Sequence, residues 1–328
     1  MRLHHLAAST ALLTFALIVL GSVVHGTGSS LACPDWPLCN GTVFPQMTGG
    51  VQFEHSHRIL ALSVTVLVAT MAFRARRRTN TRVRQLAFGA LGLVVVQASL
   101  GGLTVILRLP PAVSIAHLAT SMGVLATLVL LAIESIPGRR PAHGDASSAR
   151  TLTALAAFGA FAQLVLGALV RHTGAALACA SVPACDGAVW PDALLPRIQM
   201  VHRAGAIAIA ILVFVASWGA RSHARRGSAI HYLALAAPAI VVAQIGLGTA
   251  VVLSAAPLGL ATVHLATGAL LLSSLVALWG TLPRPPPVKP SARGAQGFSQ
   301  SAALLRVELM DEPLVREIRH VAEQGDSV

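Results

Sequence analysis

The chain has 328 residues and a formal net charge of +12, yet only 11% of its residues are charged and 55% are hydrophobic. A soluble globular protein carries about 25% charged residues, so a soluble fold is excluded and a helical membrane protein is indicated. We also expect no nucleic-acid partner, because no aromatic-interleaved basic domain accompanies the net charge.

Eight apolar segments are long enough to be membrane-spanning helices, each of which needs about 20 mainly apolar residues. They begin near Leu6, Phe53, Arg84, Ala112, Thr151, Ile198, Ala229 and Leu258. Arg2 before the first segment is also typical of a cleaved signal peptide. The internal repeat described below favours a retained first helix, because its counterpart at 151–171 is internal.

Basic residues cluster in every second loop and in the tail, between 74 and 84, 139 and 150, 221 and 226, and 284 and 293. The positive-inside rule places these segments and both termini in the cytoplasm. The loops before Phe53 and before Ile198 are then extracytoplasmic. All four cysteines lie in these two loops, which agrees with the persistence of disulfides in oxidising compartments.

The chain contains a tandem repeat. The segment "GSVVHGTGSSLACPDWPLCNG" matches "GALVRHTGAALACASVPACDG" 146 residues later, "SHRILAL" matches "VHRAGAI", and "AHLATSMGVL" matches "VHLATGALLL". Each half carries four helices, so the second half has the same orientation as the first. We therefore predict an all-α polytopic membrane protein, built as two tandem four-helix bundles related by a pseudo-two-fold axis along the membrane normal.

This duplication sets the predicted domains. Residues 1–140 form the N-terminal half, residues 141–282 the C-terminal half, and residues 283–328 a Pro-rich linker followed by a cytoplasmic tail.

Four histidines lie a few residues into helices that run inward from the outer surface, His57 and His117 in the first half and His202 and His264 in the second. With a rise of about 1.5 Å per residue they share one depth. Two imidazoles at one height inside a four-helix bundle can be the axial ligands of a haem iron. Zinc is the competing metal, but it usually needs two further ligands at each site.

Other polar and small residues accompany these histidines. Arg58 and Arg203 each follow a histidine and are candidates to pair with haem propionates, unless they extend to lipid headgroups. Gln97 and Gln244 lie mid-helix and predict interhelical hydrogen bonds. Close helix contacts are predicted at Gly101, Gly102, Gly246 and Gly248.

Between about residues 6 and 282 the chain resembles the haem A synthase family, through "CPDWPLCNG", "EHSHR" and "AHLAT" in the first half and "VHR" and "VHLAT" in the second. The resemblance implies a multi-pass oxidoreductase of the cell (inner) membrane. It would oxidise a ring methyl of haem O to a formyl group, giving haem A for terminal oxidases. The implied partners are membrane lipid, the substrate haem O, a haem O synthase that hands it over, and an unidentified electron acceptor.

The resemblance also implies roles for particular residues. His202 and His264 fall on the ligands of a b-type haem cofactor, His57 and His117 on the substrate haem site, and Glu54 on the catalytic glutamate. The paired cysteines imply the disulfides Cys33–Cys39 and Cys179–Cys185, in line with two cysteines six residues apart on an oxidising surface. The second loop, "CASVPAC", lacks the Asp and Trp of the first.

The two halves differ beside the first histidine of each. Glu54 precedes His57 by three residues, whereas the neutral Gln199 precedes His202 by three. Residues three apart share a helix face, so both are expected to point toward a haem pocket. Glu54 could take a proton, activate water or form an ester with a cationic carbon. The alternative is that Glu54 only makes a hydrogen bond at an interfacial helix N-terminus, where a negative charge is favoured and a hydrated one contributes little stability.

Two functions compete with the enzyme. A dihaem b-type electron-transfer protein would need no substrate and no asymmetry at Glu54. A transporter of parallel repeats predicts charged residues at the membrane midplane or broken helices, and the sequence shows neither clearly. The role of His55 is left open.

Overall fold

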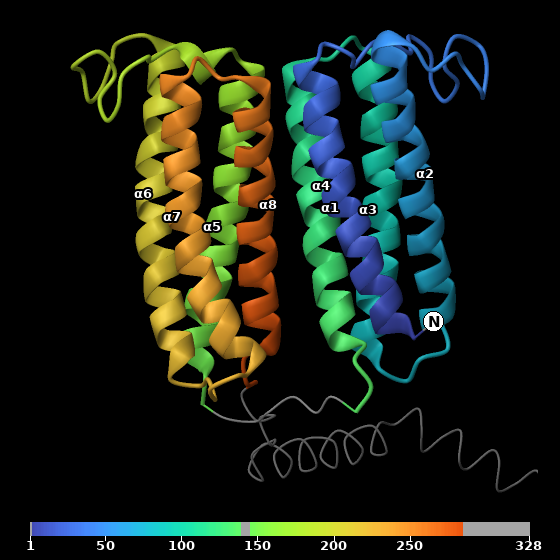
Figure 1. Cartoon of the computed structure of the whole chain (residues 1–328). Helices are drawn as coiled ribbons and strands as arrows, with labels where there is room; N and C mark the ends of the chain where they lie inside the picture. The colour runs from blue at the N-terminus through green and yellow to red at the C-terminus, as the bar shows by residue number, and fades with distance from the viewer. Residues whose placement is uncertain (1, 139–144, 285–328) are drawn as a thin grey trace, which may run out of the picture. The chain divides into compact units, whose positions relative to one another are not determined.

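A computed structural model describes residues 2–138 and 145–284 of the chain (Figure 1). Nearly all of the predicted tail lies outside these residues. Within the described residues eight helices are long and apolar enough to span a membrane, as predicted. They are α1 (Leu3–Gly26), α2 (Gly49–Ala75), α3 (Thr81–Ile106), α4 (Pro111–Glu134), α5 (Ser147–His172), α6 (Leu194–Arg221), α7 (Ala229–Leu253) and α8 (Leu258–Thr281).

Several helices begin up to four residues before the apolar run that predicted them, because their first turn includes polar residues, glycine or proline. In α3 the side chain of Asn80 accepts hydrogen bonds from the backbone N–H groups of Arg82 and Val83. This cap satisfies N–H groups that have no partner within the helix, so the helix starts at Thr81 rather than at Arg84.

The helices form two bundles of four, α1–α4 and α5–α8 (Figure 1). In each bundle every helix packs against its two neighbours, and the first helix closes the ring against the fourth. Between the bundles α4 packs against α8, α4 against α5, and α8 against α1. Since α5 is the counterpart of α1 and α8 that of α4, a two-fold rotation that exchanges the halves would turn the α4–α5 contact into the α8–α1 contact. The axis itself stays a prediction.

The two halves share apolar packing. Ala269, Leu272 and Val276 of α8 belong to the same buried cluster as Met71 and Leu128 of the first half. Many other large apolar side chains on the helices are exposed, including Leu12, Phe73, Phe158, Ile207 and Trp218. Exposed apolar surface of this extent is expected where a helix faces lipid.

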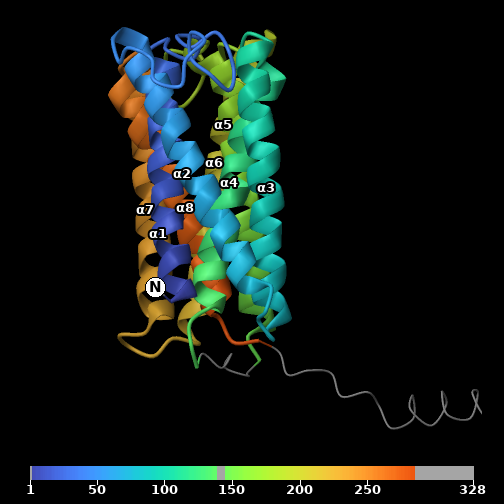
Figure 2. The same ribbon diagram turned by 90° about the vertical axis from the view of Figure 1, so that its right-hand side faces the viewer.

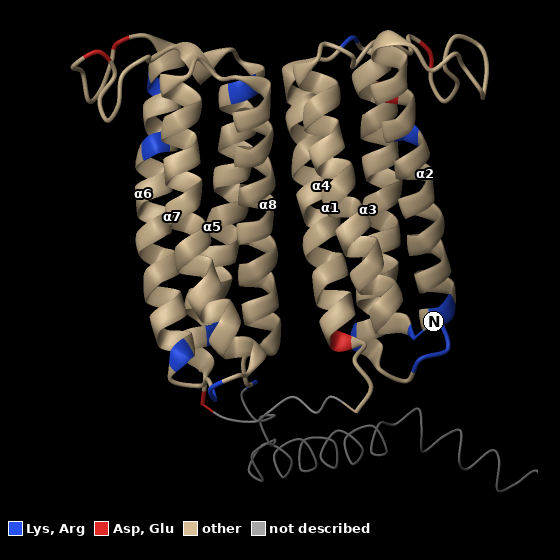
Figure 3. Cartoon of the chain, viewed as in Figure 1, with Lys and Arg blue, Asp and Glu red and all other residues tan. Residues whose placement is uncertain are grey.

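The long cysteine-bearing loops, residues 27–48 and 173–193, lie at the same end of the helices (Figure 2). The loops between α2 and α3 and between α6 and α7 lie at the opposite end, where most of the arginines gather (Figure 3). Some of these arginines also join helices: the side chain of Glu134 at the end of α4 pairs with Arg82 at 3.5 Å and with Arg284.

Candidate haem-handling site

Each cysteine loop is closed by a disulfide, Cys33–Cys39 in the first half and Cys179–Cys185 in the second, as the sequence predicted. A pair of backbone hydrogen bonds follows each, between Cys39 and Thr42 and between Cys185 and Ala188. The two loops therefore share a backbone arrangement despite their different sequences.

The Asp that the second loop lacks is replaced by a serine with a similar role. Both carboxylate oxygens of Asp35 accept backbone N–H groups, from Asn40 at 2.6 Å and from Gly41 at 2.8 Å. At the equivalent position the hydroxyl of Ser181 accepts the N–H of Asp186 at 2.7 Å. In the first loop the pKa of Asp35 is lowered, chiefly by the hydrogen bond from Gly41.

The missing Trp leaves a real difference between the loops. A Cβ added at Gly102 of α3 would lie 2.9 Å from the ring of Trp36, so this glycine provides a close contact between loop and helix. The second loop has Val182 at that position.

An arginine one residue after the first histidine of each half binds the cysteine loop. The guanidinium of Arg58 donates to the carbonyls of Asp35 at 2.7 Å, Cys33 at 2.9 Å and Leu38. In the second half Arg203 donates to the equivalent carbonyls of Ser181 at 2.7 Å, Cys179 at 3.2 Å and Ala184 at 3.3 Å. Both arginines thus hold the loop over the bundle, and pairing with propionates stays a prediction.

Glu54 lies beneath the first loop and is only 4% exposed. Its Oε2 accepts the N–H of Cys33 at 2.7 Å, and its Oε1 pairs with Arg58 at 2.6 Å. Glu54 is therefore not a hydrated charge in the first turn of the helix, because α2 begins five residues earlier and the loop covers the carboxylate. It does make hydrogen bonds, as the alternative of a purely structural role expects, and a part in chemistry stays a prediction.

Gln199 is also buried beneath its loop, but it donates hydrogen bonds to the loop whereas Glu54 accepts one. Its amide donates to the carbonyls of Ala176 at 3.1 Å and Cys179 at 3.5 Å. The Cys33 N–H thus meets a carboxylate in one half, whereas the Cys179 carbonyl meets an amide donor in the other.

The four histidines form two pairs, one in each half. His57 and His117 are close enough to interact electrostatically, and so are His202 and His264. Every one of these rings packs against a glycine of the preceding helix. A Cβ added at Gly21, Gly101, Gly167 or Gly248 would lie 3.0 to 3.1 Å from Cε1 of His57, His117, His202 or His264 respectively.

Glutamines contact three of the four rings. Gln97 lies 3.2 Å from Nε2 of His117, and Gln244 lies 3.5 Å from Nε2 of His264. The predicted interhelical hydrogen bonds of these two glutamines are confirmed, with the histidines as partners. Gln163, which the sequence did not single out, contacts His202. The prediction of a close contact at Gly246 is wrong, because an added Cβ there would meet no described atom within 4 Å.

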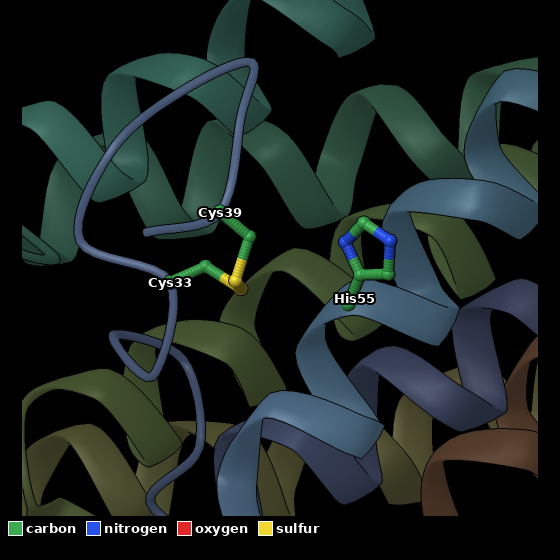
Figure 4. A group of neighbouring side chains, drawn as sticks. All are labelled: Cys33, Cys39 and His55. Atoms are coloured by element: carbon green, nitrogen blue, oxygen red, sulfur yellow. A yellow bond between two sulfur atoms is a disulfide. The ribbon is translucent and has the colours of Figure 1, made fainter. Parts of the chain in front are cut away.

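His55 packs against the first disulfide (Figure 4). One ligand atom from each of Cys33, Cys39 and His55 lies within 4.8 Å of the others. The thiolate, and not the disulfide sulfur, is the metal ligand. With the disulfide formed, this group is therefore a disulfide covered by an imidazole and not a three-ligand metal site.

Comparison with known proteins decides the family. The chain matches the family of cytochrome oxidase assembly proteins over residues 4–52 and 49–276. It belongs to this family.

Individual relatives named heme A synthase match over most of their length. The heme A synthase of Symbiobacterium thermophilum is 32% identical over 292 residues, which cover 84% of this chain and 91% of the relative. That of Bacillus pumilus is 29% identical, covering 80% and 89%, and that of Shewanella oneidensis is 28% identical, covering 85% and 96%.

The histidine pairs fit the haem that this family implies. Neutral imidazole is a common axial ligand of haem iron. Nδ1 of His57, His117 and His264 is buried without a hydrogen-bond partner in the described part of the chain, as is Oε1 of Gln97 and Gln244. Buried polar atoms normally have partners, so both bundles hold polar groups that a bound molecule would satisfy.

Proposed function

We propose that this chain is a haem A synthase, an oxidoreductase of the membrane that converts haem O to haem A. The observation that carries the proposal is the set of two histidine pairs in a duplicated bundle, of which only the first half has a carboxylate three residues before its first histidine. The named relatives support it, since each is a heme A synthase matched over most of both chains. A dihaem carrier is less well supported, because electron transfer alone gives no reason for Glu54 in one half and Gln199 in the other.

We assign the two halves different tasks. The first half receives haem O, with His57 and His117 facing the iron and Glu54 near the reacting methyl group. The second half keeps a b-type haem on His202 and His264, which when bound supplies one-electron redox capacity. This division keeps the predicted boundaries at residues 140 and 282.

Conversion of a methyl to a formyl group with water as the oxygen source releases four electrons and four protons. Glu54 can take a proton, orient water or trap a cationic carbon as an ester. Each of its oxygens has one donor in the structure. A carboxylate offers about four lone-pair sites, so sites remain for substrate. Arg58 holds both Glu54 and the covering loop, which keeps bulk water from this carboxylate.

The proposed setting is the cell (inner) membrane, with both termini in the cytoplasm and the disulfide loops outside. The arginine-rich loops at one end and the disulfides at the other support this orientation. Haem O synthase is the proposed donor of substrate, and an electron acceptor, not identified by these residues, completes the reaction.

The proposed activity is tested by pigment extraction. The chain is expressed in a host that makes haem O but lacks its own haem A synthase, and the extracted haems are separated by chromatography. A formyl-bearing haem is expected only in cells that contain the chain. Haem O alone, from cells whose membranes hold the folded haem-loaded protein, would contradict the activity.

A further inference from the structure

A second difference between the halves lies beside their first histidines. The amide nitrogen of Gln163 on α5 lies 3.0 Å from Nδ1 of His202 and donates to the His202 backbone carbonyl at 2.7 Å. The equivalent position of the first half, 146 residues earlier, holds Leu17. Leucine offers no hydrogen bond, and Nδ1 of His57 is buried without a partner in the described part of the chain.

Gly205 of α6 makes room for this glutamine. A Cβ at Gly205 would lie 2.4 Å from Oε1 of Gln163, which is too close for both to keep their places. The counterpart of Gly205 in the first half is Leu60, at the same offset of 145 that relates His57 to His202. The amide and its space thus occur together in the second half, and two leucines replace them in the first.

Such an amide can fix an imidazole that binds a metal. A metal-bound histidine normally uses its second ring nitrogen in a hydrogen bond, which sets the ring orientation and raises its basicity. A glutamine amide offers both a donor and an acceptor. A histidine that binds a metal through Nε2 carries its proton on Nδ1, so in that state Gln163 must present its oxygen to this N–H, turned from the orientation in which its nitrogen faces Nδ1. The hydrogen bond from the same nitrogen to the His202 carbonyl places the amide against this turn of α6.

We propose that Gln163 is a positioning residue for His202, and that Gln163 with Gly205 marks the half that retains its haem. Leu17 and Leu60 leave Nδ1 of His57 without this hydrogen bond, so that this histidine binds iron less firmly and can release and rebind a haem as a substrate site requires. The inference rests on the proposed function for the assignment of the resident haem, and it adds a physical reason why one haem stays and the other exchanges.

The first test replaces Gln163 in the purified haem-loaded protein. Gln163→Leu, which copies Leu17, should weaken haem retention by about 10–100-fold, the usual cost of losing such a partner. It should also raise the midpoint potential of the resident haem, because a less basic ligand stabilises ferric iron less. Gln163→Glu should restore retention and lower the midpoint potential below that of wild type. A role in packing alone would not produce this order of potentials.

The second test uses the space at Gly205. Gly205→Ala keeps the amide but displaces it, so it should weaken haem retention in the same direction as Gln163→Leu. The double variant should be no worse than Gln163→Leu, because both changes remove one interaction. Phe158→Leu is the control and should leave the spectrum unchanged, because Phe158 on α5 is 70% exposed. If Gln163→Leu does not fold, Gly205→Ala decides.

The reciprocal test builds the arrangement into the first half. Leu17→Gln combined with Leu60→Gly should slow the release of added haem O by roughly 10-fold or more, by the same partner effect. Wild-type retention and midpoint potential in Gln163→Leu, or simple additivity of the two second-half changes, would overturn the inference. Production of haem A by wild type is measured in parallel, so failure of this inference is distinct from failure of the proposed function.

Discussion

At the scale of single residues, the two halves differ in the hydrogen-bonding group beneath the cysteine loop, which is an acceptor in the first half and a donor in the second. Glu54 accepts the N–H of Cys33, whereas Gln199 donates to the carbonyl of Cys179. The sequence identified this pair, because the repeat aligns the two positions. It did not predict the loop contacts, since the way a loop folds back over its helix depends on long-range packing that local spacing does not encode.

Glu54→Gln tests whether this carboxylate takes part in chemistry. Formation of haem A should fall by roughly 100-fold or more, the usual scale for a positioned acid–base group. The free energy of unfolding should fall by about 1–3 kcal/mol, because Arg58 loses a charged partner in a buried site. The spectrum of the haem proposed for the second half should not change.

Asp35→Ala is the matched control for Glu54→Gln, because it loosens the same loop and keeps the carboxylate of Glu54. A Glu54→Gln protein that makes haem A at a near-normal rate would leave Glu54 as a structural anchor. An equal loss of product in both variants would assign the effect to the loop.

The pH dependence of the first loop follows from Asp35. Hydrogen bonds from Gly41 and Asn40 hold the pKa of this carboxyl below its usual value. Its contribution to loop order is therefore complete above the unfolded pKa of about 3.9, and is lost as the pH falls through the lower folded pKa.

Hydrogen exchange measures this loss. Below pH of about 4 the amides of Asn40 and Gly41 should lose protection relative to Asp186, whose acceptor Ser181 does not titrate. Parallel loss of protection in both loops would contradict a role for the Asp35 charge.

At the scale of the helices, each odd-numbered helix supplies a glycine and the even-numbered helix that follows it supplies the histidine that packs there. The glycine on the odd-numbered helix lets the imidazole of the next helix approach its backbone. Close packing of this kind fixes a side chain by shape before any ligand binds.

Gly248→Ala tests whether the contact with this glycine positions the imidazole of His264. The new Cβ would lie 3.0 Å from Cε1 of His264, so the ring must move and haem content should fall. Gly246→Ala, two residues away on the same helix, meets open space and is the control. The haem content of the two purified proteins is measured from their absorption spectra. Equal haem content in both would show that the contact does not position His264.

The contacts of glycines and glutamines with the histidines were only partly predictable from the sequence. Apolar runs predicted the helices to within four residues at their starts, and the cysteine spacing predicted the disulfides. Close contacts were predicted at both Gly246 and Gly248, but only Gly248, which aligns with Gly101 across the repeat, contacts His264. The rotation of α7 about its axis decides this, and the apolar run alone does not fix it. Gln163 was missed for the same reason, although its replacement by Leu17 in the repeat was a visible signal.

At the scale of the whole molecule, duplication gives two similar histidine pairs, one in each bundle, and allows their surroundings to diverge. α8 packs against α1 and α4 of the other half, and Ser22 on α1 contacts both Thr262 and Arg171 at 3.1 and 3.0 Å. The halves are therefore one packed structure and not two independent bundles. Such packing can hold two haem sites at a constant separation, as electron transfer between them would require.

The division of labour between the halves is tested most directly by replacing histidines in each pair and measuring two quantities, retained b-type haem and haem A formed. We predict that His202→Ala and His264→Ala lose the retained haem, whereas His57→Ala and His117→Ala keep its spectrum but form little or no haem A. If the second-half variants keep the haem, or the first-half variants lose it while still forming haem A, the assignment of cofactor and substrate to the two halves is wrong.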